Sequence, residues 1–166
     1  MFEKFGEFNS AEEINKAALA QREEGDEEAL KILAKENGID EDEVEDFMDC
    51  CMDELVTPLT AAVGKLDVEV EALHIKGILK DWVDELKMRC MNDEDFAKAV
   101  RQKGKDLAGY IALTAETGYK NRAVVDKKIV EKCKTIKGII GNHEFSIGIP
   151  DAATRKVLAQ EYYLGK

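Results

Sequence analysis

The feature that most constrains the fold of this chain is an acidic segment whose apolar residues recur at helical intervals. Residues 40–54 hold nine carboxylates among fifteen positions and no Lys or Arg. In a helix of about 3.6 residues per turn, the apolar residues of this stretch lie on one face about 100° wide. These residues are Val44, Phe47, Met48, Cys51 and Leu55. The segment therefore predicts an ordered amphipathic helix, and not a disordered acidic tail.

The opposite face of this predicted helix is the first candidate binding surface. Nine carboxylates over the length of the segment, at a rise of about 1.5 Å per residue, give about one charge per 2.3 Å. Duplex DNA carries about one charge per 1.7 Å, so the face resembles a nucleic-acid backbone in charge density. The residues predicted to contact a partner are Asp42, Glu45, Asp46, Asp49 and Asp53.

Charge is distributed unevenly along the sequence. Residues 1–56 carry 19 Asp/Glu against 5 Lys/Arg, a net charge of −14, within a chain whose total is −11. Residues 98–137 carry 11 Lys/Arg against 4 Asp/Glu. This basic stretch is the alternative candidate surface, for nucleic acid or for the acidic third of a second copy. The residues named for it are Arg101, Lys103, Lys105, Lys127 and Lys128.

Helix start and stop signals recur along the chain and predict the fold class. N-cap residues precede apolar periodic segments at Ser10, Asp26, Asp40 and Thr57, and at either Asn92 or Asp93. We therefore expect an all-α protein, a compact multi-helix bundle of about eight helices. One of these helices is expected from Val125 to Ile136.

Residues 139–149 break the helical pattern, because they are rich in β-branched residues and contain Gly141-Asn142. They predict a short β-hairpin. A soft boundary near residues 66–77 suggests an acidic helical part, residues 1–73, and a second helical part, residues 74–166. The two parts are also compatible with one continuous domain.

Metal binding has little support in the spacing of the ligand residues. The four cysteines contain no Cys-x-x-Cys pair. Cys51, Cys90 and Cys133 lie on the apolar sides of predicted helices, so packing in the core is the favoured interpretation. No cofactor is predicted; if zinc is bound, Cys133 with His143 is the best pair of first ligands.

No catalytic motif is present, and the abundant carboxylates lie on faces predicted to be exposed. We therefore expect a protein that is not an enzyme. No apolar stretch approaches the roughly 18 residues that cross a bilayer, and the first residues lack the features of a signal peptide. A cytoplasmic protein with no membrane partner is the expectation.

Two parts of the sequence carry a resemblance to known proteins. Residues 1–8 (MFEKFGEF) with residues 11–15 (AEEIN) resemble small acidic proteins of mobile elements in gut Firmicutes. The second half resembles the PcfK-like proteins of conjugative plasmids, a family that includes inhibitors of the type II CRISPR nuclease. The matching residues are Asp95-Phe96-Ala97, Lys105, Tyr110-Ile111, Gly118, Val125-Asp126 and Tyr162-Tyr163. The family has no catalytic signature, so the resemblance transfers no functional residue.

The resemblance implies an anti-CRISPR protein that binds and inhibits the RNA-guided type II nuclease. The acidic helix would then act as a mimic of nucleic acid, because such nucleases hold nucleic acid in positively charged channels. Two alternatives stay open. One is an accessory protein of plasmid transfer that binds nucleic acid through residues 98–137, and the other is a zinc-dependent scaffold.

Overall fold

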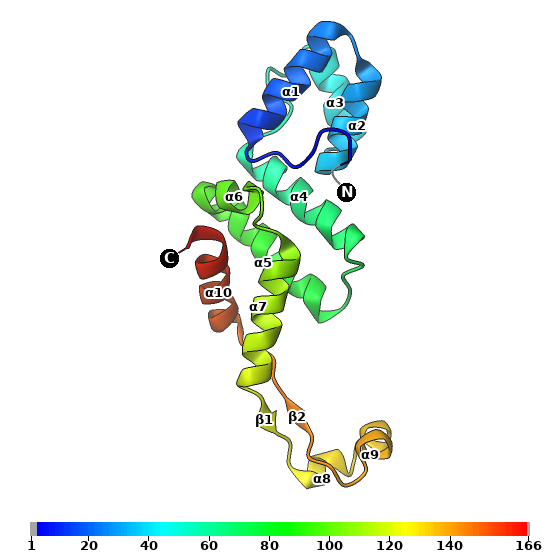
Figure 1. Ribbon diagram of the computed structural model, residues 1–166, viewed down its shortest axis with the longest axis vertical. Coiled ribbons are helices and arrows are strands. Elements are labelled where there is room, and N and C mark those ends of the chain that lie inside the picture. Colours follow the sequence, from blue (N-terminus) through cyan, green and yellow to red (C-terminus); the bar gives the residue numbers. More distant parts are fainter. Residues whose placement is uncertain (1–2, 166) are drawn as a thin grey trace.

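The computed structural model describes residues 3–165, and the structure is 67% helical (Figure 1). It contains ten helices and one two-stranded sheet, so the predicted all-α class is confirmed. The helices are α1 (Ala11–Glu24), α2 (Glu27–Asn37), α3 (Glu41–Met48), α4 (Pro58–Ala72), α5 (Ile78–Asn92), α6 (Glu94–Arg101), α7 (Leu107–Lys120), α8 (Lys127–Val130), α9 (Lys134–Ile140) and α10 (Ala152–Leu164). The strands are β1 (Ala123–Val124) and β2 (Ser146–Ile147).

The predicted N-caps begin the helices where the sequence places them. The Ser10 and Asp26 side chains accept hydrogen bonds from the third residue of α1 and of α2. Asp40 and Glu43 form a capping box at the start of α3. Thr57 caps α4, whose first residue is a proline. These side chains satisfy backbone N–H groups that have no partner inside the helix.

Apolar side chains collect in two cores that share α4. The first core lies between α1, α2 and α3 and includes Ala61 of α4. The second lies between α4, α5, α6, α7 and α10, and it includes Ala62 and Leu66 of α4. We call residues 3–56 the acidic lobe, and α4 to α7 with α10 the body. Lobe and body thus meet on α4, whereas the boundary predicted after residue 73 falls between α4 and α5. Residues 1–2 and 166 of the two predicted parts lie outside the described chain.

A buried polar joint connects the acidic lobe to the body. The Lys65 ammonium on α4 is fully buried; it donates to the carbonyls of Gln102 and Lys105 and pairs with Glu7 of the lobe at 2.9 Å. The Arg101 guanidinium on α6, also buried, donates to the amide oxygen of Asn37 on α2 at 2.7 Å. Because buried charges are costly unless they are paired, these contacts fix one relative placement of lobe and body.

Two glycines let the lobe and α4 approach at backbone contact. A Cβ at Gly64 would lie 2.2 Å from the carbonyl oxygen of Asn37, and one at Gly38 would lie 2.3 Å from the carbonyl oxygen of Gly64. Gly38 also ends α2 in the left-handed conformation, with φ of 66°. Any larger residue at either position would push α2 away from α4.

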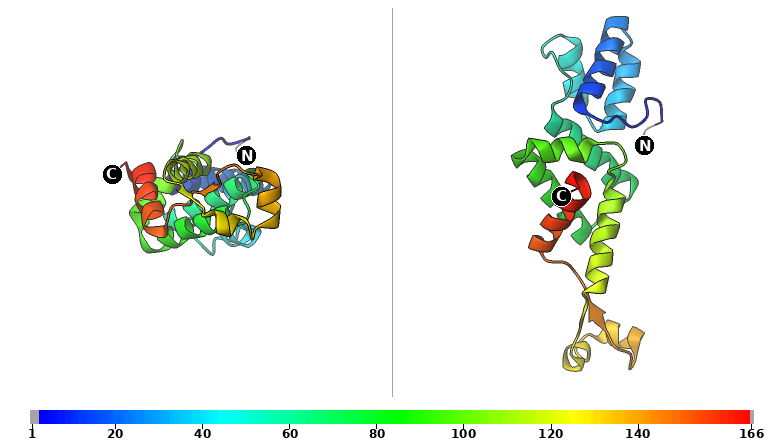
Figure 2. Two further views of the ribbon diagram at one scale, coloured as in Figure 1. Left: turned by 90° about the horizontal axis from the view of Figure 1, so that it is seen from below. Right: turned by 60° about the vertical axis from the view of Figure 1, so that its left-hand side comes forward.

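A slender arm, residues 123–147, projects from the far end of α7 (Figures 1 and 2). β1 pairs antiparallel with β2, Ala123 opposite Ile147 and Val124 opposite Ser146. The short sheet therefore joins residues on both sides of α8 and α9, and it is not closed at Gly141-Asn142. Ile139 and Ile140 instead complete α9, which ends where Gly141 takes a φ of 58°. The predicted helix from Val125 to Ile136 is interrupted by a turn between α8 and α9.

The base of the arm is packed through a second pair of glycines. A Cβ at Gly148 would lie 1.9 Å from the carbonyl oxygen of Gly118, and one at Gly118 would lie 2.5 Å from the carbonyl oxygen of Gly148. Gly118 lies in α7, whereas Gly148 follows β2. The arm therefore leaves the body along a defined direction.

No helix within residues 3–165 has the length and apolar character that a bilayer crossing requires.

Candidate functional site

The acidic lobe carries its predicted contact residues on α3 and on the loop that follows it. Val44 and Phe47 turn inward and are buried, with 1% of each residue exposed. Asp42, Glu45 and Asp46 on the same helix are exposed. The 3.6-residue period of the sequence therefore sorts the eight residues of α3 as predicted.

The helix ends earlier than predicted, which corrects the interpretation of the rest of the acidic segment. Cys50 adopts a left-handed φ of 57°, and the N–H of Cys51 donates to the carbonyl of Asp46. These contacts form the hydrogen-bonded end of a helix that normally has glycine at the left-handed position. Asp49 is consequently the C-cap, and Asp53 lies in a loop. Cys51, predicted to pack in the core, is exposed.

The loop after α3 is held against α1 by two side chains that the sequence did not single out. The Arg22 guanidinium donates to the carbonyls of Phe47 and Met52, at 3.0 and 3.4 Å, and lies 4.1 Å from the centre of the Phe47 ring. Asn15 both donates to and accepts from the backbone of Val56 at 2.9 Å. Asp49 and Asp53 are thus fixed in space although they are not helical.

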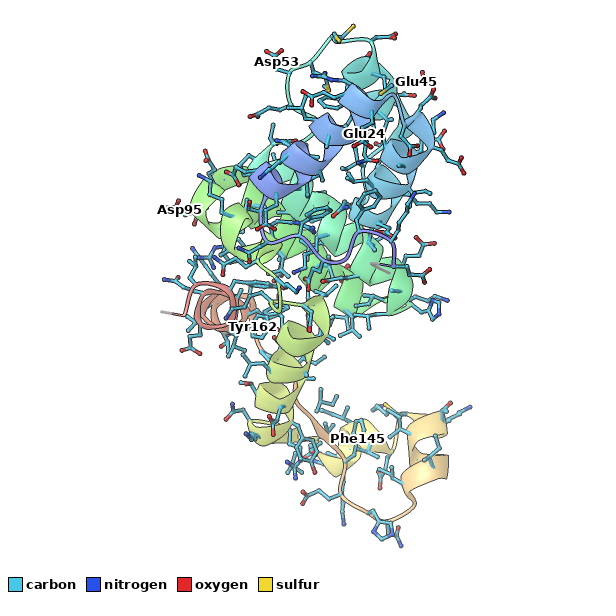
Figure 3. The ribbon with its side chains drawn as sticks, turned by 45° about the horizontal axis from the view of Figure 1, so that its top comes forward. Glu24, Glu45, Asp53, Asp95, Phe145 and Tyr162 are labelled. Carbon is cyan, nitrogen blue, oxygen red and sulfur yellow. The ribbon has the colours of Figure 1, made fainter. Side chains whose placement is uncertain are left out.

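The result is a cluster of exposed carboxylates at one end of an elongated molecule. Glu45 and Asp53 lie at this end, opposite Phe145 of the arm (Figure 3). Within residues 3–165, no ion pair neutralises any of the five predicted contact residues. Lys31 on α2 pairs with Glu27, and its raised pKa also reflects the nearby Glu41 and Glu45. This cluster is able to attract a cationic surface, but it is not the continuous helical row of charges that was predicted.

The residues named for the alternative basic surface do not form one surface. Arg101 is buried in the joint between lobe and body, where desolvation lowers its pKa to about 10, so it stays charged at neutral pH. Lys105 is half-buried and donates to the carbonyl of Tyr162 at 2.7 Å. Lys103 is exposed on the loop after α6, whereas Lys127 and Lys128 are exposed on the arm. Of the five residues, only Lys127 and Lys128 lie on the arm, away from the lobe and the body.

The cysteines and histidines give no metal centre among the described residues. No group of three or more His, Cys, Asp or Glu side chains between residues 3 and 165 is arranged to hold a metal ion. Cys133 is half-buried next to the start of α9, and His143 lines a cleft of the arm that Cys133 does not line. Cys90 is buried in the body, as predicted, and burial raises the pKa of its thiol to about 12.

One carboxyl has a strongly shifted pKa. Desolvation raises the pKa of Glu69 on α4 to about 7, although the Lys65 ammonium and the Leu107 N–H both favour the charged form. Glu69 is 2% exposed and accepts from the Leu107 N–H at 2.8 Å. The carboxyl is enclosed by the joint, and it lines none of the five main clefts of residues 3–165. Its position supports a structural role.

Comparisons with protein-family models, with curated proteins and with solved structures find no match to this chain.

Proposed function

We propose that this protein is a non-enzymatic inhibitor of an RNA-guided type II CRISPR nuclease, and that the acidic lobe makes the inhibitory contact. The observation that carries the proposal is the cluster of Asp42, Glu45, Asp46, Asp49 and Asp53, all exposed at one end of the molecule. The resemblance of the second half to the PcfK-like proteins supplies the class of target.

The electrostatics of the two partners support this pairing. CRISPR nucleases of this type hold nucleic acid in positively charged channels. A surface of opposite sign accelerates association and fixes orientation, more than it adds affinity. The lobe lies at one end of the molecule, so it is able to enter a channel ahead of the body (Figure 1). Binding there would exclude the nucleic acid that the channel serves.

The buried side of the lobe makes the proposal testable by substitution. The five carboxylates lie on the outer side of α3 and its loop, away from Val44 and Phe47. The variant Asp42→Asn, Asp46→Asn, Asp49→Asn, Asp53→Asn removes four charges while keeping side-chain volume. We expect it to fold as the wild type does and to lose inhibition of target cleavage by at least about tenfold.

The matched control removes four exposed charges from the body. Asp81→Asn, Asp84→Asn, Asp95→Asn, Glu161→Gln changes the net charge by the same amount, at positions with no ion pair in the described chain. Inhibition should be retained in this control. Equal inhibition by the lobe variant and the wild type, with both folded by circular dichroism, would remove the acidic lobe from the interface.

A further inference from the structure

The arm has no core of its own. None of the residues from Ala123 to Ile147 is buried, and α8 and α9 contribute no buried side chain. Ile129 and Ile139 are 57% and 80% exposed. A two-stranded ribbon is at best marginally stable by itself in water. An element so poorly covered, yet directed by a packed base, is typical of a surface that a partner completes.

The charges of the arm are available to a partner. All its lysines are exposed, and none forms an ion pair in the described part of the chain: Lys127, Lys128, Lys132, Lys134 and Lys137. Several body lysines, by contrast, are neutralised by a carboxylate, for example Lys87 by Asp67 and Lys98 by Glu94. The arm is also at the opposite end of the molecule from the acidic lobe (Figure 1). At about 0.1 M salt, where the Debye length is about 10 Å, the lobe therefore does little to repel an anion at the arm.

An exposed aromatic ring lies at the base of the arm. Tyr119 is 64% exposed at the end of α7, and the Arg122 guanidinium lies over its ring at 4.1 Å from the centre. Arg122 also donates to the Tyr119 carbonyl at 2.8 Å, which fixes the guanidinium on that ring. A cation stacked on an accessible ring, at the base of an arm that carries five exposed lysines, supplies the kinds of group that bind stacked bases and phosphates in single strands.

A cleft of about 370 Å³ opens between β1, α8 and the chain after α9. Its lining includes Phe145, Asn142 and His143, with Lys127 and Lys137. Phe145 lies on the arm, toward α8 (Figure 3). The cleft volume falls within the range of ligand pockets, about 300–1,000 Å³.

Carboxylates also line this cleft, and they decide which part of a nucleotide it accepts. Asp126, Glu131 and Glu144 contribute to the lining. They disfavour a phosphate inside the cleft, whereas a carboxylate accepts hydrogen bonds from the amino group of a base. Phosphates therefore belong on the lysines of the arm, two of which, Lys127 and Lys137, also line the cleft, and an unpaired base belongs in the cleft.

We infer that the arm binds single-stranded nucleic acid, with the backbone on the five lysines, one base stacked near Tyr119 and another in the cleft. A duplex would offer the lysines the same phosphates, but its bases are paired and unavailable for Tyr119 and the cleft. The acidic lobe of a second copy would pair with the lysines, but it would leave the exposed Tyr119–Arg122 stack without a role.

The test measures binding of a labelled single strand of about 12 nucleotides, as DNA and as RNA, by fluorescence anisotropy. If about five phosphates are contacted, raising the salt from about 50 to about 200 mM should weaken binding about a hundredfold, because log K falls by about 0.7 per phosphate and log unit of salt. The Tyr119→Ala variant should weaken binding of the single strand about tenfold through lost stacking. It should leave binding of a duplex of equal length unchanged.

A matched pair of variants isolates the arm. Replacing its five lysines by glutamine should reduce affinity about a hundredfold at about 50 mM salt and flatten the salt dependence. The control replaces five exposed lysines outside the arm by glutamine: Lys16, Lys35, Lys76, Lys80 and Lys156. The control has the same net charge as the arm variant. Its loss of binding free energy, relative to the wild type, should be no more than half of the loss in the arm variant.

Three results would overturn the inference. The first is absence of binding by the wild type at about 50 mM salt, and the second is an equal loss of affinity in the arm variant and in the control variant. The third is salt-sensitive self-association that disappears in the arm variant without any binding of oligonucleotide, which would assign the arm to a second copy. No nuclease enters this assay, so its failure is separate from failure of the proposed inhibition.

Discussion

At the scale of single residues, the joint between lobe and body contains the group most sensitive to pH. Glu69 has a folded-state pKa raised to about 7 by burial, against an ordinary value of 4.5. The folded protein therefore holds a proton on Glu69 between these values while the unfolded chain has lost it. Folding stability attributable to this group falls as the pH rises through this window, and the penalty is complete above the folded pKa.

We predict that the Glu69→Gln variant lacks this pH dependence. From pH 5 to pH 8 the free energy of unfolding of the wild type should fall by a few kcal/mol relative to the variant, at about 1.4 kcal/mol per pKa unit. Urea unfolding at several pH values measures the difference. The control is Glu71→Gln, an exposed residue of the same helix. Parallel curves for the wild type and the Glu69 variant would contradict the assignment.

Arg22 is one of the two side chains that hold the loop after α3 against α1. The Arg22→Ala variant loses two hydrogen bonds to backbone carbonyls and the contact with the Phe47 ring. We expect a loss of about 2 kcal/mol in the free energy of unfolding, since hydrogen bonds to charged groups contribute about 1.5–3 kcal/mol. Amide hydrogen exchange of residues 49–54 should accelerate. Lys16→Ala, exposed on the same helix, should change neither quantity; an unaltered loop in the Arg22 variant would show that another contact holds it.

Single residues also separate what the sequence predicts from what it does not. The N-caps at Ser10, Asp26 and Thr57 were predictable because a cap acts on residues only three positions away. The burial of Lys65 and Arg101 was not, because their partners Glu7 and Asn37 lie 58 and 64 positions away in the sequence. An isolated basic residue in a sequence gives no sign that a distant acceptor will enclose it.

At the scale of elements, α3 shows how a correct period leads to a wrong length. The apolar spacing from Val44 to Leu55 continues past the end of the helix, and Leu55 is indeed buried in the first core. It is buried from a returning loop, not from a helix. The helix ends at a left-handed cysteine, where the usual glycine signal is absent from the sequence.

The contact between α2 and α4 gives a test at this scale. In the Gly64→Ala variant the new methyl group would overlap the Asn37 carbonyl, so α2 and α4 must separate. We expect a loss of about 1–3 kcal/mol in the free energy of unfolding, measured by urea unfolding, as for other overpacked sites. Gly138→Ala on α9 is the control, because nothing lies within 4 Å of its added Cβ. Wild-type stability of the Gly64 variant would mean that the two helices are not in tight contact.

At the scale of the whole molecule, the arm should be dispensable for the fold of the rest. β1 and β2 are in register, and the Val125 N–H donates to the Phe145 carbonyl at 2.8 Å. Replacing residues 126–144 by Asn-Gly would thus close a two-residue hairpin on the existing ladder. We predict a free energy of unfolding equal to or above that of the wild type, because no core residue is lost and the loop is shorter. Chemical unfolding measures it, and a drop of several kcal/mol would show that the arm does support the body.

The shape of the whole was the part least accessible from the sequence. Charge counts along the chain indicated an acidic and a basic region, but not that the basic residues divide between a joint, a loop and an arm. The pairing of Ala123–Val124 with Ser146–Ile147 spans about twenty residues, and two-residue strands carry no periodic signal. The arm was therefore not predictable from local sequence patterns, because the body brings the two ends of that pairing together.

The sharing of α4 has a consequence for how this chain can be divided or recombined. Ala61 and Ala62 are neighbours in sequence, yet they belong to different cores. If the chain were divided before or after α4, one part would lose the helix that covers its apolar core. The other part would keep α4 with one apolar face uncovered. Lobe and body should therefore unfold in a single calorimetric transition. They form one cooperative unit and are not two domains that can be exchanged separately.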